Sequence, residues 1–323
     1  MDNNTVLVLA DPADRQLAML EELPPETTIA VGNSREAFER AAPEAAVIFN
    51  WALSGGLLRE VFAMSPAVRW VHVRAAGLDN LLFPELVESP VPLTNGSGVF
   101  SPSLGEFVAG AILYFAKDFR RMVRAQTAGV WDPFDTVEVA GQTVGIVGYG
   151  DIGRAVATRV RALGMQVLAL RRHGPPLYNV DPLVSQVYGP DRRAEMLARA
   201  DYVVVTAPLT PETRGMIGEP EFAAMKREAV VINVGRGQVI DEAALVGALT
   251  GQRIKGAALD VFNQEPLPAG HPFYKLENVL LSPHAADHTP DWMDQAMRFF
   301  LAQFDRFRKS EPLLNVVDKR LGY

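Results

Sequence analysis

The stretch of sequence that decides the fold is TVGIVGYGDIG, residues 143–153. Its first five residues are apolar or β-branched, which favours a buried strand, and residues 154–163 continue with helical periodicity up to Gly164. Between strand and helix the glycines follow the spacing G-x-G-x-x-G. That spacing alone is a weak signal, but a preceding strand and a following helix form the context in which such a turn binds a dinucleotide.

Each glycine of this turn has a physical role. Gly148 permits a tight turn, Gly150 lets the backbone approach a pyrophosphate, and Gly153 lets the helix pack closely on the strand. Unpaired N–H groups at the start of the helix then face the anion. A tight turn with packing glycines and no ligand is the alternative. We predict that the dinucleotide is bound here by Gly148, Gly150, Asp151, Ile152 and Gly153.

Two arginines, Arg171 and Arg172, follow the next predicted strand, residues 166–170. An NAD site usually carries an acidic residue there for the ribose 2′-hydroxyl, whereas an NADP site offers arginine to the 2′-phosphate. A guanidinium can bind that phosphate through two hydrogen bonds, and a carboxylate would repel it. The sequence therefore predicts NADP, with NADPH preferred and NADH possible. The alternative is that exposed arginines only solvate a loop.

Short apolar runs alternate with helix-like segments along the chain. Four strands are predicted before residue 101, at residues 5–9, 27–31, 45–49 and 69–73. Six more, the number in a full dinucleotide-binding sheet, are predicted at residues 143–147, 166–170, 202–206, 230–234, 256–261 and 279–282. This rhythm predicts an α/β protein with two doubly wound parallel sheets, a flavodoxin-like one and a Rossmann dinucleotide-binding one.

Two domains are expected from a chain of 323 residues. A long apolar helix is expected to link them, and Ser103 can form a capping box with Glu106 at its start. The tail, residues 312–323, is expected to return to the first domain. The predicted substrate-binding and dinucleotide-binding domains are, respectively, residues 1–101 with 290–323, and residues 102–289.

Composition disfavours several classes of function. Lys and Arg total 31 against 38 Asp and Glu, and the net charge of -7 offers no general attraction for nucleic acid. Cysteine is absent, which excludes disulfides, thiolate metal sites and cysteine nucleophiles. The longest apolar stretch, residues 107–116, is too short to span a membrane, and the N-terminal residues lack the basic region and cleavage site of a secretory signal. We expect a cytoplasmic protein that binds neither nucleic acid nor membrane.

Three residues with anion or acid–base chemistry follow successive strands of the second domain. Arg236 lies in NVGRG, Glu265 in DVFNQEP and His284 in LLSPHAA. Ligands of open α/β sheets bind at the carboxyl ends of the strands, where these side chains are expected. Any one of them alone is weak evidence, because a surface arginine or glutamate is usually only solvated.

Together the segments resemble the D-isomer-specific 2-hydroxyacid dehydrogenase family, and the likeness runs across nearly the whole chain. The matching segments are TVGIVGYGDIG, PLTPETRGMIG, AVVINVGRGQVIDEAAL, GAALDVFNQEPLP and NVLLSPHAA. Within the family the chain most resembles glyoxylate and hydroxypyruvate reductases that use NADPH. The resemblance implies hydride transfer from NADPH to a small 2-oxo acid, giving the D-2-hydroxy acid.

The roles implied for the three residues agree with what this chemistry needs. Arg236 would pair with the substrate carboxylate and polarise the 2-oxo group. His284 would give a proton to the carbonyl oxygen as the hydride arrives. Glu265 would hydrogen-bond the imidazole, orient it and favour its protonated form.

The same residue-by-residue likeness implies further site residues. Asp260 is expected near the nicotinamide carboxamide and Val234 near the nicotinamide ring. The loop RAAGLD, residues 74–79, resembles the family loop whose N–H groups, here those of Ala76 and Gly77, receive the substrate carboxylate. An ordinary turn after a strand is the alternative for this loop. The residues expected near the adenosine and pyrophosphate are Ala207, Pro208 and Thr213.

One departure from the family pattern follows His284. The family usually has a small residue and a glycine there, while this chain has Ala-Ala-Asp-His at residues 285–288. The departure concerns the wall of the pocket and leaves the acid–base residues in place. His288 lies four residues after His284, but Pro283 and the lack of a third ligand nearby disfavour a metal site, so no metal is expected.

Other functions stay open at this point. Corepressor proteins also resemble this family, so a dinucleotide sensor without turnover is the alternative to an enzyme. Formate dehydrogenases fit poorly, because their pattern has Gln-Pro where this chain has Glu265-Pro266. Phosphoglycerate dehydrogenases are less favoured, because they commonly look NAD-specific at the position of Arg171 and often carry a regulatory extension.

The resemblance also implies a homodimer. The predicted helix at residues 103–124 and the arm at residues 128–141 are the candidate contacts, because their apolar face needs cover. Trp131 is a candidate to reach the active site of the partner. The expected partners are thus a small 2-oxo or 2-hydroxy acid and a second copy of the chain.

Overall fold

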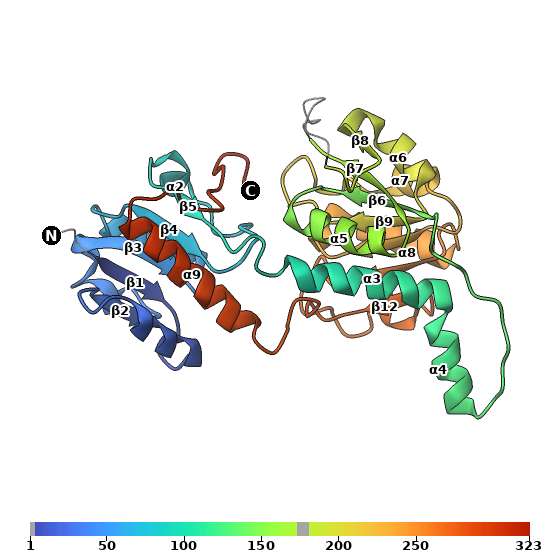
Figure 1. The fold of residues 1–323 in the computed structure, drawn as a ribbon, viewed down its shortest axis with the longest axis horizontal. Helices are drawn as coiled ribbons and strands as arrows, with labels where there is room; N and C mark the ends of the chain where they lie inside the picture. Colours follow the sequence, from blue (N-terminus) through green and yellow to red (C-terminus); the bar gives the residue numbers. More distant parts are fainter. Residues whose placement is uncertain (1–3, 173–180) are drawn as a thin grey trace. The chain divides into compact units, whose positions relative to one another are not determined.

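The computed structural model describes residues 4–172 and 181–323. The chain divides into two compact units, Met1–Phe100 with Thr289–Tyr323, and Ser101–His288. Each unit contains one sheet, and every pair of neighbouring strands in the two sheets is parallel (Figure 1). The protein is therefore an α/β protein with two parallel sheets, as the sequence predicts.

The first unit has a five-stranded sheet in the order β2-β1-β3-β4-β5, which is the flavodoxin-like order. Its β1 strand is buried along its whole length, as expected of a parallel strand covered on both faces. The strands are β1 Thr5–Leu9, β2 Ile29–Gly32, β3 Ala45–Asn50, β4 Trp70–Val73 and β5 Leu93–Thr94. The α-helices are α1 Gly55–Met64, α2 Pro84–Glu88 and α9 Trp292–Arg308.

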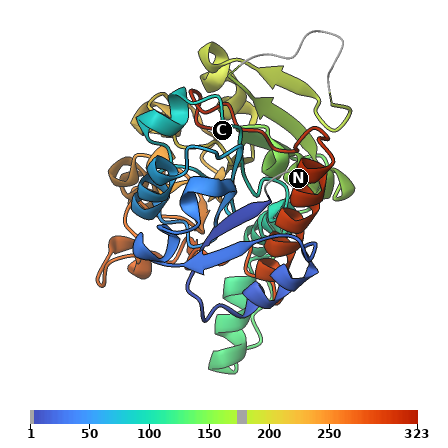
Figure 2. The same ribbon diagram turned by 90° about the vertical axis from the view of Figure 1, so that its left-hand side faces the viewer.

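The end of the chain completes this unit. Helix α9 lies against the sheet (Figures 1 and 2), and its Phe300 stacks on Phe49 of β3 with ring centroids 3.9 Å apart. After α9 the tail reaches β5, where Val316 forms an antiparallel bridge with Thr94. The predicted return of the tail to the first domain is confirmed.

One strand of the first unit was not predicted. Strand β5 has only two residues, and its pairing depends on β4 rather than on a pattern of its own. The helix-like segments expected between β1, β2 and β3 are 3-10 helices rather than α-helices. These helices are η1 Arg15–Glu22, η2 Glu36–Phe38 and η3 Ala42–Glu44.

The second unit has a seven-stranded sheet in the order β12-β11-β10-β9-β6-β7-β8. The six predicted strands are present to within two residues at each end, and the seventh, β8, extends the sheet beyond the expected number. With only three residues, β8 carries too little pattern to be found in the sequence. The strands are β6 Thr143–Val147, β7 Gln166–Leu170, β8 Gln186–Tyr188, β9 Tyr202–Val205, β10 Val230–Asn233, β11 Gly256–Leu259 and β12 Val279–Leu281.

Helices cover this sheet and connect its strands. The α-helices are α3 Ser101–Lys117, α4 Phe119–Ala128, α5 Asp151–Ala162, α6 Arg193–Arg199, α7 Glu219–Ala224 and α8 Glu242–Thr250. Short 3-10 turns are η4 Pro190–Arg192, η5 Gly237–Val239 and η6 Pro272–Lys275. Among the residues described, no helix combines the length and apolar character that a membrane span requires.

The single helix predicted at residues 103–124 is wrong, because it is broken at Asp118. This residue is left-handed, with φ 48°, and its side chain accepts a hydrogen bond from the N–H of Arg121, so it ends α3 and caps α4. The predicted capping box is also wrong. The hydroxyl of Ser103 donates to the carbonyl of Ala286 at 2.7 Å instead, because α3 already begins at Ser101.

Candidate active site

The glycine turn follows β6 directly and leads into α5. Gly148 has φ 90°, and a β-carbon there would lie 2.6 Å from the backbone nitrogen of Ala207, so both conformation and space require glycine. A β-carbon at Gly153 would lie 2.7 Å from the carbonyl oxygen of Gly148, which reflects the predicted close packing of helix on turn. The hydroxyl of Thr206, which the sequence analysis missed, donates to the carbonyl of Gly148 and holds the turn.

The beginning of α5 fits a dinucleotide phosphate. Gly150 is the N-cap, and no side chain caps the helix there. Apart from Gly150 and its two chain neighbours, no heavy atom of the described chain lies within 4 Å of the position that a β-carbon of Gly150 would occupy. A helix of 12 residues begins directly after this glycine, which is the arrangement of an anion site at a helix start.

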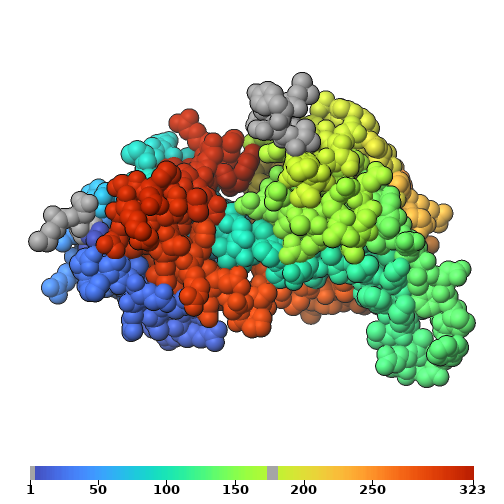
Figure 3. All heavy atoms as spheres, in the orientation of Figure 1, coloured from blue at the N-terminus to red at the C-terminus, as the bar shows by residue number. Residues whose placement is uncertain are grey.

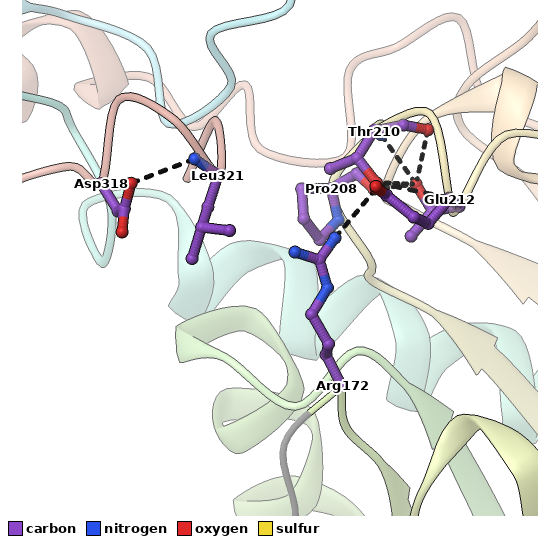
Figure 4. Close-up of polar contacts among 7 residues, drawn as sticks. Arg172, Pro208, Thr210, Glu212, Asp318 and Leu321 are labelled. Atoms are coloured by element: carbon purple, nitrogen blue, oxygen red, sulfur yellow. Dashed lines mark hydrogen bonds and ion pairs between the residues drawn. The ribbon is translucent and has the colours of Figure 1, made fainter. Parts of the chain in front are cut away.

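Arg172 lies beside the loop that follows β9, and Figure 4 shows its side chain next to Pro208, Thr210 and Glu212. Its Nη2 donates to Oε2 of Glu212 at 3.1 Å, and the hydroxyl of Thr210 donates to the same oxygen at 2.8 Å. The hydrogen bond from Thr210 is the main reason why the pKa of the Glu212 carboxyl is lowered, with backbone N–H and Arg172 adding to it. The loop is held in turn by Thr213, whose hydroxyl donates to the carbonyl of Pro208 at 2.6 Å.

Arg171 is exposed, and its backbone N–H donates to the carbonyl of Tyr188 in β8 at 3.0 Å. His173, which follows the two arginines in the sequence, lies outside the described residues. A carboxylate that the sequence analysis did not single out, Asp181, accepts hydrogen bonds from Tyr149 at 3.1 Å and from Nε of Arg154 at 2.8 Å. These contacts connect the side chain of Tyr149 in the glycine turn to the segment that precedes β8.

Glu265 and His284 form a close pair after the neighbouring strands β11 and β12. Nδ1 of His284 lies 2.6 Å from Oε2 of Glu265, while Oε1 of Glu265 accepts the N–H of Phe262 at 2.9 Å. Because a carboxylate can only accept, Nδ1 carries the shared proton and Nε2 is directed away from Glu265. The histidine side chain is 45% exposed, so that nitrogen can be reached by a ligand. The pair has the geometry of an oriented general acid–base.

Asp260 holds the backbone around His284. It is 1% exposed, and its Oδ1 accepts hydrogen bonds from the hydroxyl of Ser282 at 2.6 Å and from the N–H groups of Ala285 at 2.9 Å and Ala286 at 3.1 Å. These three bonds fix the segment on both sides of the histidine. The expected proximity of Asp260 to a nicotinamide carboxamide stays a prediction.

The residues after His284, which depart from the family pattern, include a second carboxyl group near Asp260, that of Asp287. Burial raises the pKa of Asp287, and the charge of Asp260 acts in the same direction, whereas His288 and His284 lower it. Nε2 of His288 lies 3.8 Å from Oδ1 of Asp287. Among the described residues no group of three His, Asp or Glu side chains is arranged to hold a metal ion.

Arg236 follows β10, the strand next to β11, in a turn fixed by Asn233. The side chain of Asn233 accepts the N–H of Gly235 at 3.1 Å and donates to the carbonyl of Arg236 at 3.0 Å. Nη1 of Arg236 donates to the carbonyl of Gly235 at 2.8 Å. Asn233 was missed by the sequence analysis, although an asparagine at a strand end is a usual signal for such a turn.

The sheet explains why these segments come together. Strands β12, β11, β10, β9 and β6 are consecutive neighbours and all parallel, so their carboxyl ends share one edge. Val234 follows β10, and Ala207 and Pro208 follow β9, along the same edge. Ala76 and Gly77 belong to the first unit, where they follow β4 and are half-buried.

Comparison with known proteins identifies a family model and several relatives that match this chain. Residues 109–286 match the model of the NAD binding domain of D-isomer specific 2-hydroxyacid dehydrogenases. A glyoxylate reductase from Korarchaeum cryptofilum is 35% identical over 271 residues, which are 81% of this chain and 80% of the relative. A D-3-phosphoglycerate dehydrogenase from Methanocaldococcus jannaschii is 30% identical over 97% of this chain, but the match spans only 59% of that longer protein.

A solved structure is similar over the full length. It is that of an NADPH-dependent glyoxylate/hydroxypyruvate reductase from Sinorhizobium meliloti in complex with NADP and sulfate, with a TM-score of 0.85 and 28% identity, covering 99% of this chain and 100% of that one. The expected family and the relationship to glyoxylate reductases are thus confirmed. This chain belongs to the D-isomer specific 2-hydroxyacid dehydrogenase family, whose members act on small 2-oxo and 2-hydroxy acids with a nicotinamide dinucleotide.

Proposed function

We propose that this protein reduces small 2-oxo acids of the glyoxylate and hydroxypyruvate type with NADPH and forms the D-2-hydroxy acid. The observation that carries the proposal is the pair of His284 and Glu265, 2.6 Å apart at the edge of the sheet that also carries the glycine turn. A protein that only binds a dinucleotide does not need this pair of side chains. A protein that transfers a proton beside a hydride donor needs such an oriented acid–base catalyst.

The second unit supplies the cofactor site in this proposal. When bound, the dinucleotide supplies the hydride. The turn and the start of α5 would hold its pyrophosphate, and the loop after β9 would contact its adenosine and pyrophosphate. The residues assigned to these contacts are Gly148, Gly150, Asp151, Ile152, Gly153, Ala207, Pro208 and Thr213. Val234 is assigned to the nicotinamide ring and Asp260 to the carboxamide.

Arg171 and Arg172 are proposed to bind the 2′-phosphate and so to favour NADPH over NADH. The side chain of Glu212, which pairs with Arg172, is 68% exposed, and an ion pair with such an exposed partner is weak. A phosphate monoester carries almost two negative charges, so it competes well for the same guanidinium. The complex of the Sinorhizobium meliloti reductase with NADP supports this choice of cofactor.

The chain's own residues account for proton transfer and substrate orientation. Protonated His284 gives the proton on Nε2 to the carbonyl oxygen of the substrate as the hydride reaches the carbonyl carbon, and it regains a proton from solvent afterwards. Glu265 holds the ring in position and stabilises its positive charge. Arg236 pairs with the substrate carboxylate and polarises the carbonyl group, and the N–H groups of Ala76 and Gly77 receive the same carboxylate.

Two further properties belong to the proposal. Residues 1–101 with 290–323 bind the substrate, and residues 102–289 bind the dinucleotide. The protein forms a homodimer through α4 and the arm after it, whose surface is light green in Figure 3. Exposed apolar side chains gather there, and Trp131 is 94% exposed. The others are Phe119, Met122, Val123, Val130 and Val137.

The test is oxidation of NADPH and of NADH by the purified protein with a panel of 2-oxo acids. The panel contains glyoxylate, hydroxypyruvate, its 3-phosphate, pyruvate and 2-oxoglutarate. We expect turnover with the first two and a higher kcat/KM with NADPH. His284→Ala should abolish turnover while NADPH still binds, since only the chemical step needs the imidazole. Binding of NADPH without turnover of any acid would refute the proposal and favour a sensor.

A further inference from the structure

Two successive carbonyl groups after β4 are bound by one segment. The carbonyl of Ala75 accepts the N–H of Gly96 at 3.0 Å, and the carbonyl of Ala76 accepts Nδ2 of Asn95 at 2.7 Å. In a trans peptide the N–H points opposite to the C=O of the same plane. Both carbonyls point to the 95–96 segment, so the N–H groups of Ala76 and Gly77 both point away from it.

These two N–H groups form a pair of adjacent donors. Within the described part of the chain, neither donates a hydrogen bond to another protein group. Both residues are half-buried, so the donors are partly shielded from bulk water. Adjacent backbone N–H groups directed to one side make a small anion-binding concavity, and its orientation depends on what holds the carbonyls behind it.

The side chain of Asn95 is well placed to hold the carbonyl of Ala76. It is 7% exposed, and both ends of its amide are used, because Oδ1 accepts the N–H of Ser97 at 3.2 Å while Nδ2 holds Ala76. The residue after Asn95, Gly96, also lies close to the 74–77 loop. A β-carbon at Gly96 would lie 2.1 Å from the carbonyl oxygen of Arg74, so only glycine allows the two segments this approach.

The tail of the chain fixes the 95–97 segment from its other side. Asn315, left-handed with φ 54°, donates from Nδ2 to the carbonyl of Ser97 at 2.6 Å and, more weakly, to that of Asn95 at 3.4 Å. Nearby, Val317 N–H donates to the carbonyl of Leu93 in β5 at 2.8 Å. The support therefore runs from the tail, through Asn95, to the peptide that carries the two donors.

We propose that Asn95, supported by Asn315, is a positioning residue for the substrate carboxylate. It acts by fixing the direction of the N–H groups of Ala76 and Gly77. The inference rests on the proposed function and extends it to a residue that does not touch the substrate. Because the carboxylate is present both before and during hydride transfer, losing this orientation should raise KM for the 2-oxo acid much more than it lowers kcat.

The test uses the full chain with NADPH bound and two substitutions of Asn95. Asn95→Ala removes the donor without adding charge, and Asn95→Asp keeps the size and the bond to Ser97 but cannot donate to Ala76. We expect KM for glyoxylate to rise about 10- to 100-fold in both, the range for a hydrogen bond to a charged group. We expect kcat to change by less than about threefold and KM for NADPH to stay the same. A rise with Asn95→Asp alone would indicate charge repulsion and overturn the proposal.

Lys319→Met is the matched control for lost stability. Nζ of Lys319 ties the same tail to the carbonyls of Leu86, Ser89 and Val91 at 2.8, 2.6 and 2.8 Å, and none of these residues belongs to the 74–77 loop or the 95–97 segment. This variant should lower the melting temperature of the protein and leave KM for glyoxylate unchanged. An equal rise of KM in the control would mean that the effect is general loosening, and the positioning role would be wrong.

Binding of oxamate, a carboxylate that is not reduced, separates this inference from the proposed function. The dissociation constant of oxamate from the NADPH-loaded protein should rise in both Asn95 variants by about the same factor as KM. If the unsubstituted protein bound oxamate but reduced no 2-oxo acid, the proposed function would fail and the Asn95 variants would still test the donors. Unchanged oxamate affinity in Asn95→Ala would refute the positioning role alone. No oxamate binding and no turnover in the unsubstituted protein would refute both.

Discussion

Acidification should destabilise the first unit through one buried side chain, His72 of β4. His72 is 0% exposed, and its Nδ1 lies 2.7 Å from the hydroxyl of Thr94, which also accepts Nε1 of Trp70 at 2.8 Å. Nε2 is buried and has no hydrogen-bond partner within the described structure. Aromatic rings surround the imidazole, with those of Phe49 and Phe300 centred 5.3 and 5.7 Å away. A charged imidazolium would be poorly solvated there, and burial lowers the pKa of His72 to about 3.

The direction and size of the effect follow from this pKa. In the unfolded chain the imidazole has its ordinary pKa of 6.5, so as pH falls the unfolded state takes up the proton first. The contribution to the free energy of unfolding is therefore present above pH 6.5 and is lost progressively between pH 6.5 and about 3. The loss is about 1.4 kcal/mol between pH 7.5 and pH 5.5, or roughly 5 °C in melting temperature for a domain of this size.

The assay compares melting temperatures at pH 7.5 and pH 5.5 for the original chain and for His72→Phe and His72→Leu. Carboxyl groups titrate alike in all three proteins, so the difference between their pH dependences isolates the imidazole. Both variants should lose about 5 °C less on acidification than the original chain, whatever their stability at pH 7.5. An identical pH dependence in all three proteins would show that His72 is protonated in the folded state at pH 5.5, and the reasoning from burial would be wrong.

Further expectations concern the proposed site. Glu265→Gln should lower kcat for reduction roughly 10- to 100-fold, because the neutral amide stabilises the charged imidazole less; an unchanged kcat would contradict this role. Replacing Arg171 and Arg172 together by alanine should raise KM for NADPH tenfold or more and leave KM for NADH nearly unchanged, and an equal effect on both cofactors would argue against a 2′-phosphate contact. Trp131→Glu together with Val123→Glu should convert the dimer to a monomer, as measured by sedimentation velocity. If the variant stayed dimeric, the interface would have to lie on another surface of the protein.

Sequence patterns predict the fold well where they are long. The sequence predicts strands β6 and β7 residue for residue, since each is a short, mostly apolar run followed by an interpretable turn. Strand β8 has three residues and β5 two, and both exist because a neighbouring strand pairs with them. The break between α3 and α4 depends on one left-handed residue, Asp118, which no periodicity reveals.

The residues of the candidate site likewise fall into those that the sequence predicts and those that it does not. Glu265 and His284 could be predicted because their residue types and spacing carry the chemistry, and the structure brings them within hydrogen-bonding distance. Asn95 could not be singled out, because its importance lies in which backbone carbonyl it reaches. For Asn95 that carbonyl belongs to a residue 19 positions away, which only the folded chain makes visible.

The contribution of α9 and the tail to the first sheet has a consequence for synthesis. The N-terminal 100 residues emerge from the ribosome first, yet Phe49 lacks its stacking partner, and β5 its outer neighbour, until the last 35 residues have been made. The second unit is continuous, so it can complete its core while the first still waits. During translation the order of folding should therefore be the reverse of the order of appearance. In a released chain truncated after residue 290, the second unit should resist protease and the first should be open to cleavage.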